Sequence, residues 1–147
     1  ATGRSVESSF DGTWYARYNA GPFSVGYQLG YLDRGLKAAA TAATATKTVA
    51  AAGGHFETES MSVAFNVNEN FSISWAELTE TYDAATNVAA GRATDIADVD
   101  MDSTSIQFAY TMGSMSIKGY QTDTDNPGWD SDAQSDEITE IAVNFAF

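Results

Sequence analysis

Apolar and polar residues alternate with a period of two along seven stretches of the chain, which predicts seven β-strands. In the stretch 23–31 every second residue, from Phe23 to Tyr31, is large and apolar, while the residues between them are small or polar. Because successive side chains of a strand point to opposite sides, each predicted strand has one apolar and one polar face. The predicted strands cover residues 10–19, 23–31, 56–67, 71–76, 102–112, 115–122 and 141–147.

The connections between these strands are alternately short and long. The short ones are residues 20–22, Asn68-Glu69-Asn70 and Gly113-Ser114, and the long ones are residues 33–54, 83–98 and 123–135. Tight turns at one end and long loops at the other are typical of transmembrane barrels, whereas a β-sandwich does not require this alternation. Aromatic residues near the strand ends fit the interfacial girdles of such barrels: Trp14, Tyr18, Phe23, Tyr31, Phe71, Trp75, Tyr110 and Phe147. We therefore predict an all-β, antiparallel, up-and-down transmembrane β-barrel.

The last stretch, Ile141-Ala-Val-Asn-Phe-Ala-Phe147, keeps its alternation up to the final residue. If Phe147 ends at the short-turn side, the first strand runs in the same direction as the last, and residues 1–9 lie on the long-loop side. An antiparallel barrel closes with an even number of strands. We therefore expect residues 1–147 to be a single domain that forms the C-terminal portion of a longer barrel. The alternative is that residues 1–9 form a short eighth strand.

The composition is acidic, with 20 Asp and Glu against 7 Lys and Arg and a net charge of -13, which argues against a nucleic-acid partner. The mean hydropathy of -0.24 is that of a soluble protein, but alternation also produces a low average in membrane barrels. The absence of cysteine fits an outer-membrane and a cytosolic protein equally well. The first residues do not form a signal peptide, so either it was removed or the chain begins partway through a longer protein.

The last strand ending at Phe147, the two tight turns and the hairpin Ala-Gly-Pro-Phe-Ser-Val-Gly-Tyr-Gln-Leu-Gly-Tyr (20–31) resemble the C-terminal half of a Gram-negative general porin of the alphaproteobacterial type. The resemblance implies a barrel of about 16 strands around an aqueous channel, usually assembled as a homotrimer in the cell outer membrane. These would be its strands ten to sixteen. In that family the C-terminal Phe is recognised by the barrel-assembly machinery, and Phe147 matches it.

Such a protein acts by passive diffusion of small hydrophilic solutes and ions, and its other partners are the lipid bilayer and lipopolysaccharide. The constriction loop of the family follows an early strand, so the pore-narrowing acids cannot be assigned to this chain.

No constellation typical of an enzyme appears in the sequence. The single histidine, His55, is expected at a loop–strand junction, where a lone histidine is more often solvated than catalytic, and neither a phosphate-binding loop nor Cys/His metal spacing occurs. Arg17 and Lys118 fall on polar positions of their strands, where a cation in a channel would bias the passing ions. Other candidates for the channel lining are Tyr15, Gln28, Gln107 and Tyr120. The alternative is that these residues only pair with acids such as Asp11 or Glu140.

A second candidate site is acidic. Its members are Asp123, Asp125, Asp130 and Asp132, whose spacing begins like that of a Ca²⁺-binding loop. Pro127 interrupts the pattern, and Gln134 stands where a bidentate Glu is required, so a solvated external loop is the alternative reading. Three further acids, Glu57, Glu59 and Glu77, share the parity of the apolar positions, which places them at the lipid headgroups or in a subunit contact.

Two other classes of protein remain open at this point. A small closed outer-membrane barrel for adhesion or anchoring has the same alternation but no conducting channel. A soluble β-sandwich whose acidic loops hold Ca²⁺ and a ligand also buries one face of each strand.

Overall fold

The computed structural model describes residues 10–33, 55–83 and 98–146. Residues 1–9 and Phe147, to which the sequence assigned an external segment and an assembly signal, lie outside these ranges. In the described part there is no helix with the length and apolar character needed to cross a membrane.

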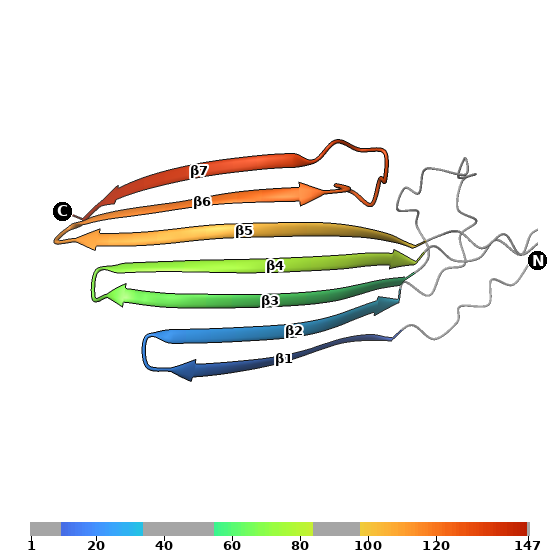
Figure 1. Cartoon of the computed structure of the whole chain (residues 1–147), viewed down its shortest axis with the longest axis horizontal. Helices are drawn as coiled ribbons and strands as arrows, with labels where there is room; N and C mark the ends of the chain where they lie inside the picture. Colours follow the sequence, from blue (N-terminus) through green and yellow to red (C-terminus); the bar gives the residue numbers. More distant parts are fainter. Residues whose placement is uncertain (1–9, 34–54, 84–97, 147) are drawn as a thin grey trace, which may run out of the picture.

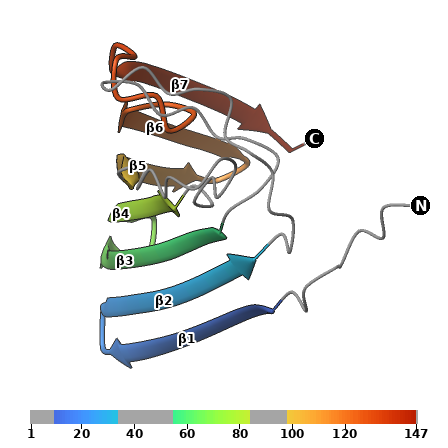
Figure 2. The ribbon, with the colours of Figure 1, turned by 90° about the vertical axis from the view of Figure 1, so that its right-hand side faces the viewer.

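Seven antiparallel strands form one sheet, in which each strand pairs with its neighbours in the sequence (Figure 1). The strands are β1 (Asp11–Ala20), β2 (Phe23–Asp33), β3 (His55–Asn68), β4 (Phe71–Asp83), β5 (Val99–Met112), β6 (Met115–Asp125) and β7 (Asp136–Phe145). Seen from the end where the long connections lie, the strands form a single layer in chain order (Figure 2). The all-β, up-and-down prediction is confirmed, and the two sheets of a sandwich are not found among the described strands.

Three tight turns lie together at one end of the sheet, which we call the short-turn end; the other is the long-connection end (Figure 1). Gly21 and Gly113 begin two-residue turns with φ of 58°, a conformation that glycine adopts without a steric penalty. Between β3 and β4 the pairing shifts between Asn66 and Asn68, and the side chain of Asn68 accepts a hydrogen bond from the Asn70 amide at 2.8 Å. The predicted three-residue turn is therefore a two-residue turn preceded by a β-bulge.

Several strands extend farther toward the long-connection end than the alternation predicted. β4 continues past residue 76 to Asp83, and β7 begins at Asp136 rather than at residue 141. In these extensions the face that is apolar elsewhere carries Glu, Thr and Asp, while Leu78, Tyr82 and Ile138 lie on the polar face, so the apolar periodicity is lost, but backbone pairing continues. Thr79 and Thr81 also donate side-chain hydrogen bonds of 2.6 Å to Asp102 and Asp100 on β5, respectively. The sequence had predicted that Trp75 lies near the end of its strand, which is wrong, because the longer β4 places it within the strand.

The register gives the sheet two chemically different faces. The apolar face carries large apolar side chains from every strand, among them Trp14, Val25, Val63, Trp75, Ile106, Ile117 and Val143. The polar face carries their sequence neighbours: Tyr15, Ser24, Ser62, Ser74, Gln107, Lys118 and Ala142. The described residues form no second layer over the apolar face, so its side chains are exposed.

One contact within the apolar face leads to a stability prediction. Gly119 of β6 is buried beneath the Phe108 ring of β5, and a Cβ atom there would overlap Phe108 Cε1 and lie 3.3 Å from the Glu140 carbonyl oxygen. Gly119→Ala must move the ring, so we expect it to lower the free energy of unfolding by about 1–2 kcal/mol. Urea unfolding of the folded protein measures the change. In a Phe108→Leu background the cost should largely disappear; an equal cost in both backgrounds would contradict the steric account.

Candidate functional site

The six residues predicted to line a channel all lie on the polar face. Tyr15 of β1 is directly opposite Gln28 of β2, and Gln107 of β5 is directly opposite Tyr120 of β6. Arg17 follows Tyr15 on the same side of β1, and Lys118 precedes Tyr120 on the same side of β6. They form two groups, one on β1 and β2 and one on β5 and β6, with β3 and β4 between them.

The contacts of these residues are local and partly confirm the alternative that they pair with neighbouring acids. The Tyr120 hydroxyl donates a 3.0 Å hydrogen bond to Glu140 Oε2 on β7. Arg17 Nε donates to Asn19 Oδ1 at 3.2 Å. Neither Arg17 nor Lys118 forms an ion pair with a residue of the described ranges. Both side chains are exposed on this face.

A shallow depression of about 490 Å³ lies on the polar face over β3 to β7. Its polar lining residues are Asn66, Ser72, Ser74, Gln107, Lys118, Tyr120 and Glu140. Small residues such as Ala109 and Ala142 lie between these groups, and their short side chains do not fill the depression. The surface has one cation, one carboxylate and several neutral hydrogen-bonding groups, which suits contact with water and polar solutes without covalent chemistry.

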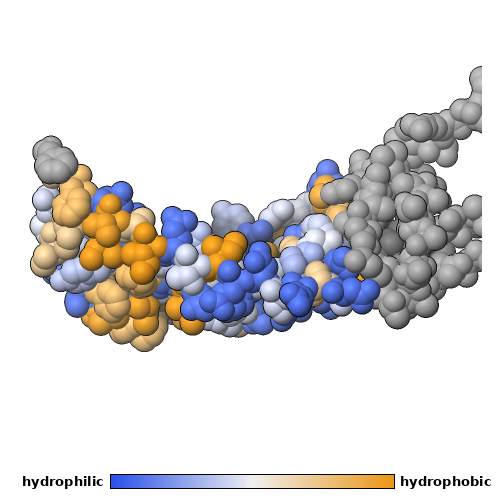
Figure 3. All heavy atoms as spheres, turned by 90° about the horizontal axis from the view of Figure 1, so that it is seen from above, coloured by the Kyte–Doolittle hydropathy of each residue, from blue (hydrophilic) through white to orange (hydrophobic). Residues whose placement is uncertain are grey.

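The opposite face is divided into two bands along the strands. Toward the short-turn end lies the apolar band, which includes Leu29, Val63, Phe65, Ile73, Trp75, Ile106, Phe108, Ile141 and Val143. Toward the long-connection end lies the acidic band, which includes Glu57, Glu59, Glu77, Asp83, Asp100, Asp102, Asp123, Asp125 and Glu137. Seen along the edge of the sheet, hydrophobic residues gather at the short-turn end and hydrophilic ones toward the other (Figure 3).

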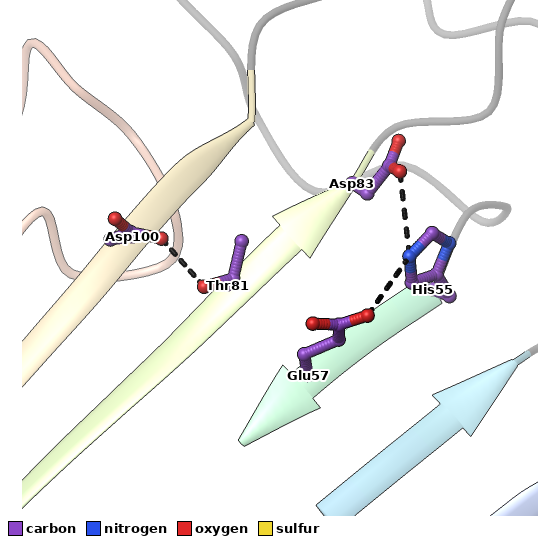
Figure 4. A network of polar contacts seen from close by, with 5 residues as sticks. All are labelled: His55, Glu57, Thr81, Asp83 and Asp100. Atoms are coloured by element: carbon purple, nitrogen blue, oxygen red, sulfur yellow. Dashed lines mark hydrogen bonds and ion pairs between the residues drawn. The ribbon is translucent and has the colours of Figure 1, made fainter. Parts of the chain in front are cut away.

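His55 lies in the acidic band and is held by carboxylates on two strands (Figure 4). Its Nε2 is 3.4 Å from Asp83 Oδ2 on β4 and 3.7 Å from Glu57 Oε1 on β3. The Tyr31 ring of β2 lies beside it, with 5.3 Å between the ring centroids. His55 thus begins a strand, and its neighbours are carboxylates and a phenol rather than a nucleophile.

The proposed Ca²⁺ loop is not assembled. Within residues 10–33, 55–83 and 98–146, no three His, Asp or Glu side chains are placed to share a metal ion. Asp123 and Asp125 belong to β6 and lie on its acidic band, whereas Asp130 lies in the following connection and accepts a 3.1 Å hydrogen bond from the Asp132 amide. Asp125 instead accepts a hydrogen bond from the Ser135 hydroxyl. Asp123 and Asp125 are part of an extended strand and Asp130 is part of a connection, so the carboxylates are not brought together as their spacing in the sequence had suggested.

A cluster of aromatic residues on the polar face was not predicted from the sequence. Phe56 of β3 and Tyr82 of β4 are 2% and 0% exposed, and Trp129 from the connection after β6 packs on both rings. The signal was present in the sequence, because Phe56 has the parity of the polar residues of its strand. Tyr82 was not recognised because the prediction ended that strand at residue 76.

No protein-family model matches the chain, and neither a curated protein nor a solved structure does so.

Proposed function

We propose that this sheet is part of an outer-membrane β-barrel of a Gram-negative bacterium, whose polar face lines a water-filled channel for the passive diffusion of small hydrophilic solutes and ions. The observation that carries the proposal is the exposure of the apolar band. Ile106, Ile141 and Phe145 are 62%, 65% and 59% exposed, and all three lie on the same face. Soluble monomeric proteins rarely expose a contiguous apolar surface of this kind, whereas hydrocarbon chains solvate it.

The height of the apolar band supports the same proposal. At about 3.4 Å per residue, the apolar stretches of β2 and β3 span about 20–27 Å along the strand; the strand tilt of about 35–45° in membrane barrels reduces this to a height of roughly 14–22 Å, which approaches their ~25 Å apolar belt. Glu59 and Glu77 follow the apolar stretches of their own strands on the same face, and Glu59 is directly opposite Leu29 of β2. We place them at the level of the lipid headgroups or in a contact between subunits of a homotrimer, where a charge costs about 0–1 kcal/mol.

The edges of the sheet set a further requirement of the proposal. Among the described residues, β1 pairs only with β2 and β7 only with β6. Unpaired backbone groups are costly in hydrocarbon, so both edges must pair with further strands in the membrane. A porin of about 16 strands meets this requirement, and Phe147 would then be the signal read by the assembly machinery.

The channel selects solutes by its diameter, its lining and its fixed charge. The net charge of -13 favours cations, while Arg17 and Lys118 place two positive charges on the lining itself. No covalent step is assigned to the chain, since His55 and its two carboxylates lie on the opposite face.

The first test is reconstitution of the protein that contains this chain into liposomes, followed by osmotic swelling in sugars of increasing size. A channel predicts swelling that slows steadily as the sugar becomes larger. A protein that stays monodisperse in water without detergent would favour a soluble binding module. Stable insertion without permeability would favour a closed barrel used for adhesion or anchoring.

Lys118→Glu tests the assignment of the polar face. Reversing a charge on the channel wall should raise the permeability ratio of K⁺ over Cl⁻ about three- to tenfold at low ionic strength, because two unit charges change close to the ion path. Reversal potentials across a planar bilayer under a KCl gradient measure the ratio. Glu77→Lys is the matched control, since it changes the charge by the same amount on the opposite face. If Glu77→Lys changed the permeability ratio more than Lys118→Glu, the face with Glu77 would line the channel and the face with Lys118 would contact lipid.

A further inference from the structure

The connection between β6 and β7, residues 126–135, reaches across the polar face at the long-connection end. Its Trp129 ring lies 4.8 Å from the Phe56 ring and 6.2 Å from the Tyr82 ring, measured between centroids. These two residues belong to β3 and β4, three and two strands away from β6. With a spacing of about 4.8 Å between strands, the contact lies roughly 10–14 Å across the surface of the sheet from the strand that carries the connection.

Hydrogen bonds hold the segment in this position. Trp129 Nε1 donates to the Glu80 carbonyl oxygen of β4 at 3.0 Å, and Asn126 Nδ2 donates to the Asp100 carbonyl oxygen of β5 at 2.8 Å. Asn126 directly follows the last residue of β6 that pairs with β5, since the final pair of these strands is Asp102 with Asp125. The segment is thus attached to two strands that are not its neighbours in the sequence.

The backbone of the segment supports a fixed conformation. Asn126 and Trp129 have φ of 49° and 57°, and a bulky residue such as Trp rarely adopts a positive φ. The turn is closed by a 2.9 Å hydrogen bond from the Trp129 amide to the Asn126 carbonyl. Such strain persists where the surroundings determine the conformation, and here the contacts of the indole ring do so.

We propose that residues 126–135 partly occlude the mouth of the channel and set the upper size of the solutes that enter it, with Trp129 as the residue that fixes the segment over the polar face. This inference rests on the proposed function, because the polar face must line the channel. The aromatic cluster provides the independent observation. It contains two of the three hydrophobic residues that are buried in the described part, Phe56 and Tyr82, and it joins the connection to two strands in the middle of the strand order.

The functional arm of the test uses the protein reconstituted in planar bilayers and liposomes. Trp129→Ala releases the segment, so we expect the single-channel conductance to rise about twofold and larger sugars to enter, because both depend on the pore diameter. Trp129→Phe keeps an aromatic ring on the cluster but loses the hydrogen bond to Glu80, so its effect should be smaller. Tyr18→Ala, which removes an exposed aromatic residue from the apolar face, is the control and should leave the conductance unchanged. Wild-type conductance and size limit in Trp129→Ala would overturn the inference.

Asn126→Gly covers the case in which Trp129→Ala does not fold, since glycine keeps the positive φ and the substitution removes the bond to β5. It should give a smaller change in the same direction, and an unchanged size limit would again overturn the inference.

The structural arm does not depend on conductance. A variant that keeps Trp129 as its single tryptophan, Trp14→Phe/Trp75→Phe, should show severalfold weaker acrylamide quenching than the same variant with Phe56→Ala. If the protein conducts but Trp129 is fully quenched, the inference fails and the proposed function stands. If the protein does not conduct, both fail, even when Trp129 is shielded.

Discussion

Ile106→Arg is expected to lower the free energy of unfolding in a lipid bilayer by about 1–3 kcal/mol, between the ~2–4 kcal/mol of an arginine at the bilayer midplane and the ~0–1 kcal/mol near the interface, whereas Gln107→Arg should change it by less than about 1 kcal/mol. The two residues are neighbours on β5 and lie on opposite faces of the sheet. Ile106 pairs with Trp75 and Gln121 and is the last apolar residue on this face of β5 before the acidic band. Its side chain is 62% exposed. In the membrane that exposure is to hydrocarbon, where a guanidinium loses its hydration; a residue on the channel wall keeps it.

Equilibrium unfolding in urea, with the protein folded in vesicles of medium-chain phosphatidylcholine, measures both variants. The matched substitution on the neighbouring residue controls for strand propensity and for the added charge. Equal costs for the two variants would contradict the assignment of one face to lipid and the other to water. A larger cost for Gln107→Arg would reverse it.

The second large effect is expected at the aromatic cluster, which does not depend on the membrane. Tyr82 is fully buried, and its ring stacks on Phe56 with 4.8 Å between centroids. Tyr82→Ala removes this ring and leaves a cavity beneath Trp129, so we expect a loss of about 3–5 kcal/mol in the free energy of unfolding. Tyr15→Ala is the control: Tyr15 lies on the same face but is 74% exposed, so its removal should cost no more than about 0.5 kcal/mol.

The same urea experiment, followed by tryptophan fluorescence, reports on both variants. In Tyr82→Ala the emission of Trp129 should also shift to longer wavelength, since the indole ring loses one of its two aromatic neighbours. A loss in Tyr82→Ala no larger than that in Tyr15→Ala would show that the cluster contributes little to the stability of the sheet.

The strands could be recognised from the sequence wherever one face is apolar and the other polar. Periodicity placed β2 within two residues of its observed bounds because five large apolar residues alternate with small or polar ones. It failed in the second half of β4, where Glu77-Leu-Thr-Glu-Thr-Tyr-Asp83 carries polar groups on both sides. There the strand is stabilised by pairing with β3 and β5, which are distant in the sequence, and no local pattern reports such pairing.

The residues of the candidate sites could also be predicted only in part. Parity was sufficient to place Arg17, Lys118 and the four uncharged candidates on one face, because side chains alternate strictly along a strand. Parity was insufficient for the acidic cluster, since Asp123 and Asp125 belong to a strand and Asp130 to a connection. Spacing along the chain does not give the distance between side chains once part of the run is extended.

The sequence by itself determined that the chain is all-β, which residues share a face, and where the tight turns lie, because these properties follow from residues within a few positions of one another. Only the tertiary structure decided the extent of the strands, the band of acids beyond the apolar band, and the contact of Trp129 with Phe56 and Tyr82. That contact joins residues 47 to 73 positions apart in the sequence. It forms because the pairing of β3 to β6 brings two buried rings to the place where the chain leaves β6, and alternation along a single strand contains no information about it.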